Sequence, residues 1–292
     1  TAGIGPGRLW YPISPVGGRA PPLWFRKTNP TAPRRDLTVC AGGNALAADA
    51  LRAVAAYTDD EGAREYADRI LDGLERDLID TESGAVTHYR GSDDAGETDL
   101  LEDAARVVGA YVRAAGVRGE GVDVARAVAD RAIDRLHVDG SFVDGPRSGP
   151  GLLDRSFRPL DANVEMATAL LDLAARTGEA RYREVARKTA EAFAGATDRL
   201  GVQVAAYGSL VGRLRRDATV IAVGTAPGSD LHRAAWRVAD HEKVVAPNAH
   251  ADDAPAPRSV PEGTAVVLAG DAASEPAATP AELSACVGAV LD

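Results

Sequence analysis

The sequence predicts a mainly α-helical protein built from repeated helical hairpins, and three observations support this. Small and apolar residues recur at three- and four-residue spacing from residue 44 to about residue 200. The helical segments come in pairs, the first richer in Ala, Gly and Leu and the second more charged. Asn44, Asp103 and Asn163 lie near the starts of the three first helices, about 60 residues apart. This alternation predicts hairpins of an α/α toroid, a partial (α/α)6 barrel, because inner helices are surrounded by protein and outer helices face water on one side.

The toroid segment is expected over residues 38–217. Its first hairpin is predicted at 44–60 and 61–80, its second at 99–116 and 121–138, its third at 160–178 and 179–200, with one more inner-type helix at 201–217. A short strand-like stretch at 84–90 separates the first two hairpins. Each pair is therefore predicted to place one helix inside the toroid and one outside.

Both ends of the chain depart from the repeat. Residues 1–37 are rich in Pro and Gly, with four aromatic residues interspersed, which predicts an extended arm. Residues 218–292 alternate short β-branched segments with helical ones, which predicts a small α/β region. Its strands are expected at 218–224, 242–247 and 263–270, and its helices at 230–240 and 279–292.

Composition argues against several classes of function. The 43 acidic and 33 basic residues give a formal net charge of −10, which disfavours binding to nucleic-acid phosphates. No apolar run approaches the roughly 20 residues that span a membrane, and the start lacks the pattern of a signal peptide. We therefore expect a cytoplasmic protein without membrane contact, and the acidic composition is typical of a salt-adapted, halophile-like cytoplasm. Cys40 and Cys286 stand far apart and the histidines lack ligand spacing, so neither a metal nor a cofactor is predicted.

The candidate functional residues lie where the predicted inner helices begin. In an α/α toroid these ends surround the central cavity, so its rim is expected to hold Asn44, Glu102, Asp103, Asp161, Asn163 and Glu165. Carboxylates and amides recognise sugar hydroxyls, and a pair of carboxylates such as Asp103 and Glu165 can act as acid and base if one is held protonated. The same residue types also cap helices and complement their dipoles, and this alternative stays open.

The loop between the first two hairpins adds two candidates, His88 and Arg90. His88 is a candidate base for an epimerase-type proton transfer, and Arg90 is a candidate for binding the substrate. An exposed loop histidine without any catalytic role is the alternative. The other four histidines show no metal-ligand spacing and are interpreted as structural or solvent-facing.

Several segments resemble one family. NALAADALRAVAAYTDD, LLEDAARVVGAYVRAAG, PLDANVEMATALLDLAARTGEARYREVA and VIAVGTAPGSDLHRAA resemble the C-terminal half of the thioredoxin-domain proteins typified by YyaL and the spermatogenesis-associated thioredoxin-domain protein, over roughly residues 30–292. The resemblance implies a toroid similar to N-acylglucosamine 2-epimerase and the six-hairpin glycosidases. The family's Leu-Glu-Asp motif falls intact on 101–103, its Trp-Asn-Gly motif keeps only Asn44, and its helix-start motif falls near Asn163. The family's thioredoxin domain and paired cysteines have no counterpart here.

Two main functions follow from these interpretations, and a redox accessory role, for which the sequence carries no Cys-x-x-Cys motif, is a third. The first is a carbohydrate-related toroid that binds a polyol at its rim and, if it is an enzyme, acts as a sugar epimerase or a glycoside hydrolase. The second is a non-catalytic scaffold or interaction module in which the rim residues are helix caps. An incomplete toroid would expose apolar surface of its inner helices, so a protein partner or self-association is also expected.

Overall fold

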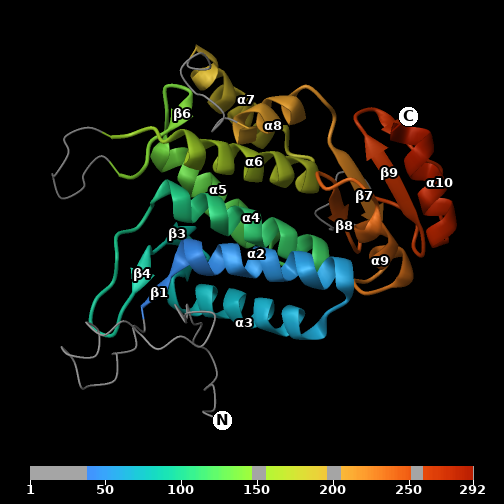
Figure 1. Ribbon diagram of the computed structural model, residues 1–292, viewed down its shortest axis with the longest axis horizontal. Helices are drawn as coiled ribbons and strands as arrows, with labels where there is room; N and C mark the ends of the chain where they lie inside the picture. The colour runs from blue at the N-terminus through green and yellow to red at the C-terminus, as the bar shows by residue number, and fades with distance from the viewer. Residues whose placement is uncertain (1–37, 147–155, 196–204, 251–258, 292) are drawn as a thin grey trace, which may run out of the picture.

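The computed structural model describes residues 38–146, 156–195, 205–250 and 259–291, and three helical hairpins follow one another along this part of the chain (Figure 1). The predicted arm over 1–37 lies outside the described residues. The hairpins are α2 (Ala41–Thr58) with α3 (Glu61–Asp77), α4 (Leu101–Arg118) with α5 (Val122–Leu136), and α6 (Leu160–Thr177) with α7 (Ala180–Phe193). The predicted mainly helical fold is confirmed.

The first helix of each hairpin lies inside and the second outside. Helices α2, α4 and α6 pack side by side, and the short helix α8 (Ala205–Leu214) packs against α6 (Figure 1). Helix α4 buries residues all around its axis, because α2, α6 and α5 all contact it. Helix α3 instead buries a single stripe of Ala63, Ala67, Ile70, Leu71 and Leu74. The predicted difference between inner and outer helices therefore reflects how many sides of each helix meet protein.

The inner helices end in the same way. Asp59, Gly119 and Gly178 take left-handed backbone conformations directly after α2, α4 and α6, with φ of 59°, 82° and 75°. In each case the backbone N–H of this residue donates to the carbonyl four residues earlier. Glycine adopts this conformation without steric cost, and Asp tolerates it better than most residues. These residues end the inner helices and reverse the direction of the chain, so that the outer helices can follow.

Short two-stranded ribbons lie where the inner helices begin. Strand β1 (Val39–Cys40) pairs with β4 (Tyr89–Arg90), β2 (Ile79–Asp80) with β3 (Ala85–Val86), and β5 (His137–Val138) with β6 (Ser141–Phe142). The strand-like stretch expected over 84–90 contains two short strands rather than one. It is split into β3 and β4, because each half pairs with a different partner and His88 lies between them.

The C-terminal part forms the predicted small α/β unit. Its elements are β7 (Thr219–Val223), α9 (Asp230–Arg237), β8 (Val244–Ala246), β9 (Ala265–Ala269), β10 (Ala272–Ala273) and α10 (Pro280–Leu291). The sheet has the order β10-β9-β7-β8, with β7 parallel to β8 and antiparallel to β9. Figure 1 shows this unit at the end of the molecule where the inner helices stop. None of the helices in the described ranges is both long and apolar enough to cross a membrane.

A buried polar contact joins the α/β unit to α4. His232 on α9 is 4% exposed, and its Nε2 lies 2.8 Å from the carbonyl oxygen of Gly116. Its Nδ1 accepts a hydrogen bond of 3.1 Å from the backbone N–H of Gly228. The indole N–H of Trp236 donates to the same Gly116 oxygen at 3.2 Å. This arrangement suits a neutral His232, with a hydrogen on Nε2 and a lone pair on Nδ1.

Stability is expected to fall in mild acid because of His232. Burial lowers the pKa of His232, the hydrogen bond with the Gly116 carbonyl opposes this, and the charges of Arg64 and Arg233 lower the pKa further. The unfolded chain binds a proton near the ordinary pKa of about 6.5, so the free energy of unfolding should decrease as the pH falls below that value, by at most about 1.4 kcal/mol per pH unit for this group. Chemical denaturation at about pH 7.5 and about pH 5.5 measures the loss. The loss should be smaller in His232→Gln; an equal loss in both proteins would contradict the prediction.

Candidate functional site

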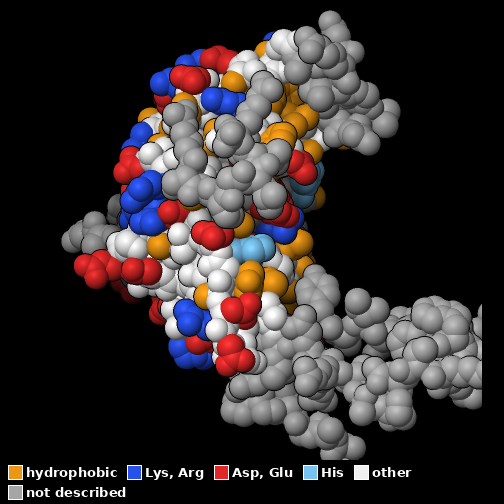
Figure 2. Space-filling view, turned by 90° about the vertical axis from the view of Figure 1, so that its left-hand side faces the viewer, with side chains coloured by type: hydrophobic (Ala, Val, Ile, Leu, Met, Phe, Trp, Pro, Cys, Tyr) orange, Lys and Arg blue, Asp and Glu red, His pale blue; other side chains and the backbone are white. Residues whose placement is uncertain are grey.

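A cleft of about 920 Å3 opens on the side of the molecule that the inner helices face. Residues of α2, α4, α6 and α8 and of the loops before them line it. Figure 2 views the end at which the inner helices begin, and acidic, basic and histidine side chains are visible around the hollowed right-hand side. The cleft therefore combines an apolar helical wall with charged groups.

A histidine and a carboxylate form the best-defined polar contact in the cleft. His88 Nδ1 lies 2.7 Å from Asp103 Oδ2, and the other carboxylate oxygen accepts a hydrogen bond of 2.8 Å from the backbone N–H of Gly42. Asp103 is only 3% exposed, whereas the side chain of His88 is 44% exposed. Burial raises the pKa of Asp103, while the bonds from His88 and Gly42 oppose this rise. Asp103 thus fixes the orientation of the imidazole through Nδ1, and the opposite edge of the ring, which carries Nε2, stays accessible.

Arg106 links two acidic residues on neighbouring helices. It forms an ion pair with Glu102 one turn earlier on α4, and its Nε lies 3.5 Å from Glu165 Oε1 on α6. Burial raises the pKa of Glu165, Arg106 lowers it, and the nearby charges of Glu102 and Asp161 raise it again. A glutamate with a raised pKa in a cleft is a candidate acid or base.

A second layer of charges lies deeper along the same helices. Asp49 on α2 forms an ion pair with Arg113 on α4, and Asp172 on α6 forms one with Arg213 on α8. Burial raises the pKa of Asp49, and Arg113 opposes the rise. The spacing of seven residues from Arg106 to Arg113, and from Glu165 to Asp172, is a sequence signal that could have revealed this layer.

Five of the eight residues expected to form the site line one cleft. These are His88, Glu102, Asp103, Asp161 and Glu165. They come from the loop before β4, from the first turn of α4 and from the first two turns of α6, so the helical repeat brings together residues that are distant in sequence.

The other three residues have different surroundings. Asn163 is fully buried; its amide accepts from the N–H of Phe142 at 2.8 Å and donates to the carbonyls of Phe142 and Pro159. Asn44 donates to the carbonyl of Cys40, and Arg90 donates to the carbonyl of Asp77. The amide of Asn163 is occupied by backbone groups, and none of the three lines the cleft.

Some of the predicted rim residues contact helix N-termini, as the capping alternative expects. The N-cap residues of α2, α4 and α6, which are Cys40, Leu100 and Pro159, make no side-chain cap hydrogen bond. Glu102, Asp103 and Asp161 lie in the first turns of α4 and α6, where negative charge complements the helix dipole. Asp161 Oδ1 also accepts from the N–H of Ala162 at 3.0 Å. Asp103 instead accepts from the first turn of the neighbouring helix, α2. This contact between helices is possible because α2 and α4 begin at the same end of the molecule (Figure 1).

The local sequence pattern did not reveal the role of Gly42 in the site. A Cβ atom placed on this residue would lie 2.6 Å from Asp103 Oδ1 and 3.3 Å from Arg106 Cδ. Such contacts are too short, so the approach of Asp103 to the backbone of α2 requires a glycine at this position. Its position within the Gly-rich start of α2 is the only sequence signal for this role.

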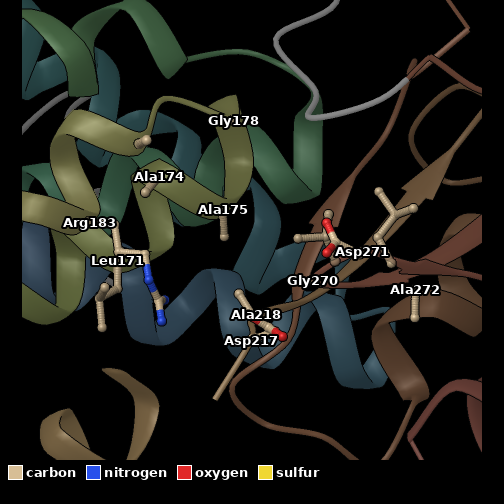
Figure 3. A pocket seen from close by; sticks show the side chains of 13 residues that line it. Leu171, Ala174, Ala175, Gly178, Arg183, Asp217, Ala218, Gly270, Asp271 and Ala272 are labelled. Carbon is tan, nitrogen blue, oxygen red and sulfur yellow. The ribbon is translucent and has the colours of Figure 1, made fainter. Parts of the chain in front are cut away.

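A smaller cavity of about 440 Å3 lies between the α6–α7 hairpin and the sheet (Figure 3). Its polar side chains are Arg183 on α7, Asp217 before β7 and Asp271 in the turn between β9 and β10. Arg183 is occupied by the carbonyls of Leu214 and Arg216, at 2.8 and 3.1 Å. Alanine forms much of the remaining wall, so this cavity carries little chemistry.

Within the described part of the chain, no three His, Cys, Asp or Glu side chains converge as a metal site.

Helical hairpins packed around an open cleft have the architecture of an α/α toroid. No protein family and no curated protein matches the sequence. Several solved structures are similar to part of the chain. An unsaturated glucuronyl hydrolase from Bacillus sp. GL1 is 19% identical, with a TM-score of 0.45 over 53% of this chain and 46% of that one. A GH76 α-mannanase from Bacteroides thetaiotaomicron is 14% identical, with a TM-score of 0.48 over 57% and 47%.

A sugar epimerase from a ruminal bacterium is 12% identical, with a TM-score of 0.44 over 51% of this chain and 42% of that one. This chain therefore spans about half the length of these three structures. The similarity is weak in both sequence and structure.

Proposed function

We propose that this chain contributes a sugar-binding or polyol-binding cleft to a carbohydrate-active toroid, in which His88 transfers a proton. The observation that carries the proposal is the hydrogen bond between His88 and Asp103 at the wall of the 920 Å3 cleft. Clefts of about 300–1,000 Å3 with a few convergent polar groups are typical of small-molecule sites. Glu102, Asp161 and Glu165 supply acceptors for sugar hydroxyls in the same cleft.

In this proposal His88 acts as a base. A hydrogen on Nδ1 is donated to the carboxylate of Asp103, which leaves the lone pair of the imidazole on Nε2. Within the described residues, Nε2 makes no hydrogen bond, so it is accessible to a bound sugar. An epimerase-type reaction would move a proton to Nε2 from the carbon next to the carbonyl group of an open-chain sugar, with the electron pair delocalised onto the carbonyl oxygen, and return a proton to the opposite face of that carbon. Glu165, whose pKa is raised by burial, is the candidate for the second transfer.

The geometry favours proton transfer over a glycosidase mechanism based on Asp103 and Glu165. A glycosidase of the common type needs two carboxyl groups that flank the bond to be cleaved. Both oxygens of Asp103 are bound, one by the N–H of Gly42 and the other by His88, and the side chain is buried. Asp103 therefore suits the role of a positioning residue better than that of a nucleophile or a general acid.

Thermal unfolding with a panel of mono- and disaccharides tests the proposal. A sugar at about 100 times its dissociation constant stabilises a protein by about 2.7 kcal/mol, which raises the melting temperature of a chain of this size by roughly 5–10 °C. We expect such a shift for at least one sugar class, and its loss in Glu165→Gln. Glu184→Gln, on the exposed surface of α7, is the matched control and should retain the shift. If every sugar leaves the melting temperature unchanged, the proposal is wrong.

The non-catalytic interaction module remains a second candidate because one observation favours it. Leu46, Val54 and Tyr57 on α2 are 47%, 45% and 42% exposed, and α2 contacts an inner helix on one side only. An exposed apolar stripe of this kind is typical of a protein contact. Self-association that Val54→Glu prevents, in a chain that no sugar stabilises, would support this candidate. Membership of the thioredoxin-domain family stays a prediction.

A further inference from the structure

We infer that the cleft is the open end of a longer groove that runs along the inner helices and binds a linear oligosaccharide of several rings. This inference rests on the proposed function, since it names the class of ligand for the same site. It goes beyond a rim that binds a single polyol, because it assigns binding to the deep part of the helical wall.

A second cavity continues the cleft toward the α/β unit. This cavity has a volume of about 320 Å3 and shares five lining residues with the cleft: Gly109, Arg113, Thr168, Asp172 and Ser209. Its remaining wall includes Trp236 on α9, Lys243 and the first residues of β8. The two cavities therefore adjoin, and the combined groove extends from the rim to the α/β unit.

The groove is long enough for a chain of sugars. Its wall on α4 extends from Glu102 in the cleft to Gly116 in the second cavity, which is about 21 Å at 1.5 Å per residue. Polar groups occur along this distance rather than at the rim alone. Arg106 lies one turn below Glu102, and Arg113 lies two turns further. A ligand along the groove would meet a charged side chain at intervals, whereas a single ring would use only those at the rim.

Small residues keep the two parts of the groove connected. Gly109 lies in the middle of α4 and lines both cavities, with Thr168 of α6 and Ser209 of α8 in the same shared wall. A Cβ atom on Gly109 would have no heavy atom within 4 Å. Glycine inside a helix costs about 0.5–1 kcal/mol relative to alanine, and no backbone contact requires it here. The absence of a side chain at this position leaves the passage between the cavities open.

Gly109→Leu is designed to obstruct the groove without disturbing the fold. Leucine has a higher helix propensity than glycine and would project into open space, so the melting temperature should not decrease. Gly109→Ala is the matched control, because it makes the same change of backbone propensity with a side chain too small to fill the passage. Affinities are measured by calorimetry for gluco-, manno- and xylo-oligosaccharides of increasing length, from mono- to tetrasaccharide.

For one of these series, the unmodified chain should bind the tetrasaccharide at least about tenfold more tightly than the monosaccharide. Gly109→Leu should remove this gain while changing monosaccharide affinity by less than about twofold, and Gly109→Ala should retain the gain. Affinity that does not rise with length, or a gain that survives in Gly109→Leu, would overturn the inference and leave the proposed rim site intact. A chain that binds no sugar of any length would overturn both. The length series is informative on the unmodified chain alone, even if a variant does not fold.

Discussion

The Asp103→Asn variant is expected to fold normally and to lose its proton-transfer activity by about 10²- to 10⁴-fold, the usual contribution of a general base. The amide of asparagine can still accept the N–H of Gly42 through its oxygen. Its NH2 group would then face Nδ1 of His88, which has to accept a hydrogen bond instead of donating one. The imidazole hydrogen moves to Nε2, and the lone pair no longer faces the cleft.

Stability should change little in the same variant. A neutral amide is less costly to bury than a carboxylate, and burial already raises the pKa of Asp103. We therefore expect the free energy of unfolding to change by less than about 1.5 kcal/mol. Chemical denaturation measures this change, and nitrogen NMR of the His88 ring reports which nitrogen carries the hydrogen.

Asp144→Asn is the matched control for Asp103→Asn. Asp144 also lines the cleft, and it accepts a hydrogen bond from the backbone N–H of Phe157 at 3.1 Å. This control removes one negative charge from the same cleft but leaves the contact of His88 intact. An Asp103→Asn protein whose His88 keeps the hydrogen on Nδ1, or which keeps its activity, would show that Asp103 does not position the imidazole.

The Asn163→Ala variant should lose about 3 kcal/mol of stability and keep its response to sugars. Removing the amide leaves the N–H and the carbonyl of Phe142 buried without their side-chain partner. Each unsatisfied buried group costs about 1–3 kcal/mol. The melting temperature should fall by roughly 5–10 °C, since 1 kcal/mol corresponds to a few degrees in a chain of this size. Thermal unfolding with and without a sugar that stabilises the unmodified chain measures both effects.

Asn44→Ala provides the comparison, because Asn44 occupies the matching position in the first inner helix. Its amide makes one hydrogen bond, to the carbonyl of Cys40 in an exposed setting, so its removal should cost less than about 1 kcal/mol. If Asn163→Ala were as stable as Asn44→Ala and lost the sugar response, Asn163 would be a ligand-binding residue after all.

Most of the secondary structure could be predicted because the periodic pattern is strong. The apolar stripe of α3, the small and apolar residues of α4 and the β-branched segment of β7 mark their elements in the local sequence. The strand-like stretch predicted at 84–90 covers β3 and β4, but the pairings β1–β4, β2–β3 and β5–β6 could not be predicted, since their strands have two residues each. Two residues carry no measurable period, so these ribbons depend on pairing across the chain.

Polar residues that share one local sequence pattern lie in different surroundings in the structure. Asn163 and Glu165 lie two residues apart at the start of α6, yet one is buried against β6 and the other faces the cleft. Their directions differ by about 200° around the helix axis, at 3.6 residues per turn. The repeat predicted that both residues lie at the rim. Which of the two side chains faces the cavity depends only on the elements that pack against α6.

The sequence by itself determined the helices, their inner and outer order and the acidic character of the chain, because these depend on composition and on spacing within one segment. The tertiary structure alone decided that Asp103 contacts both Gly42 and His88, and that Arg106 reaches Glu165 on another helix. These contacts join residues as much as 61 positions apart. They arise because α2, α4 and α6 pack side by side and begin at the same end of the molecule (Figure 1), so that short distances in space connect segments that no local pattern relates.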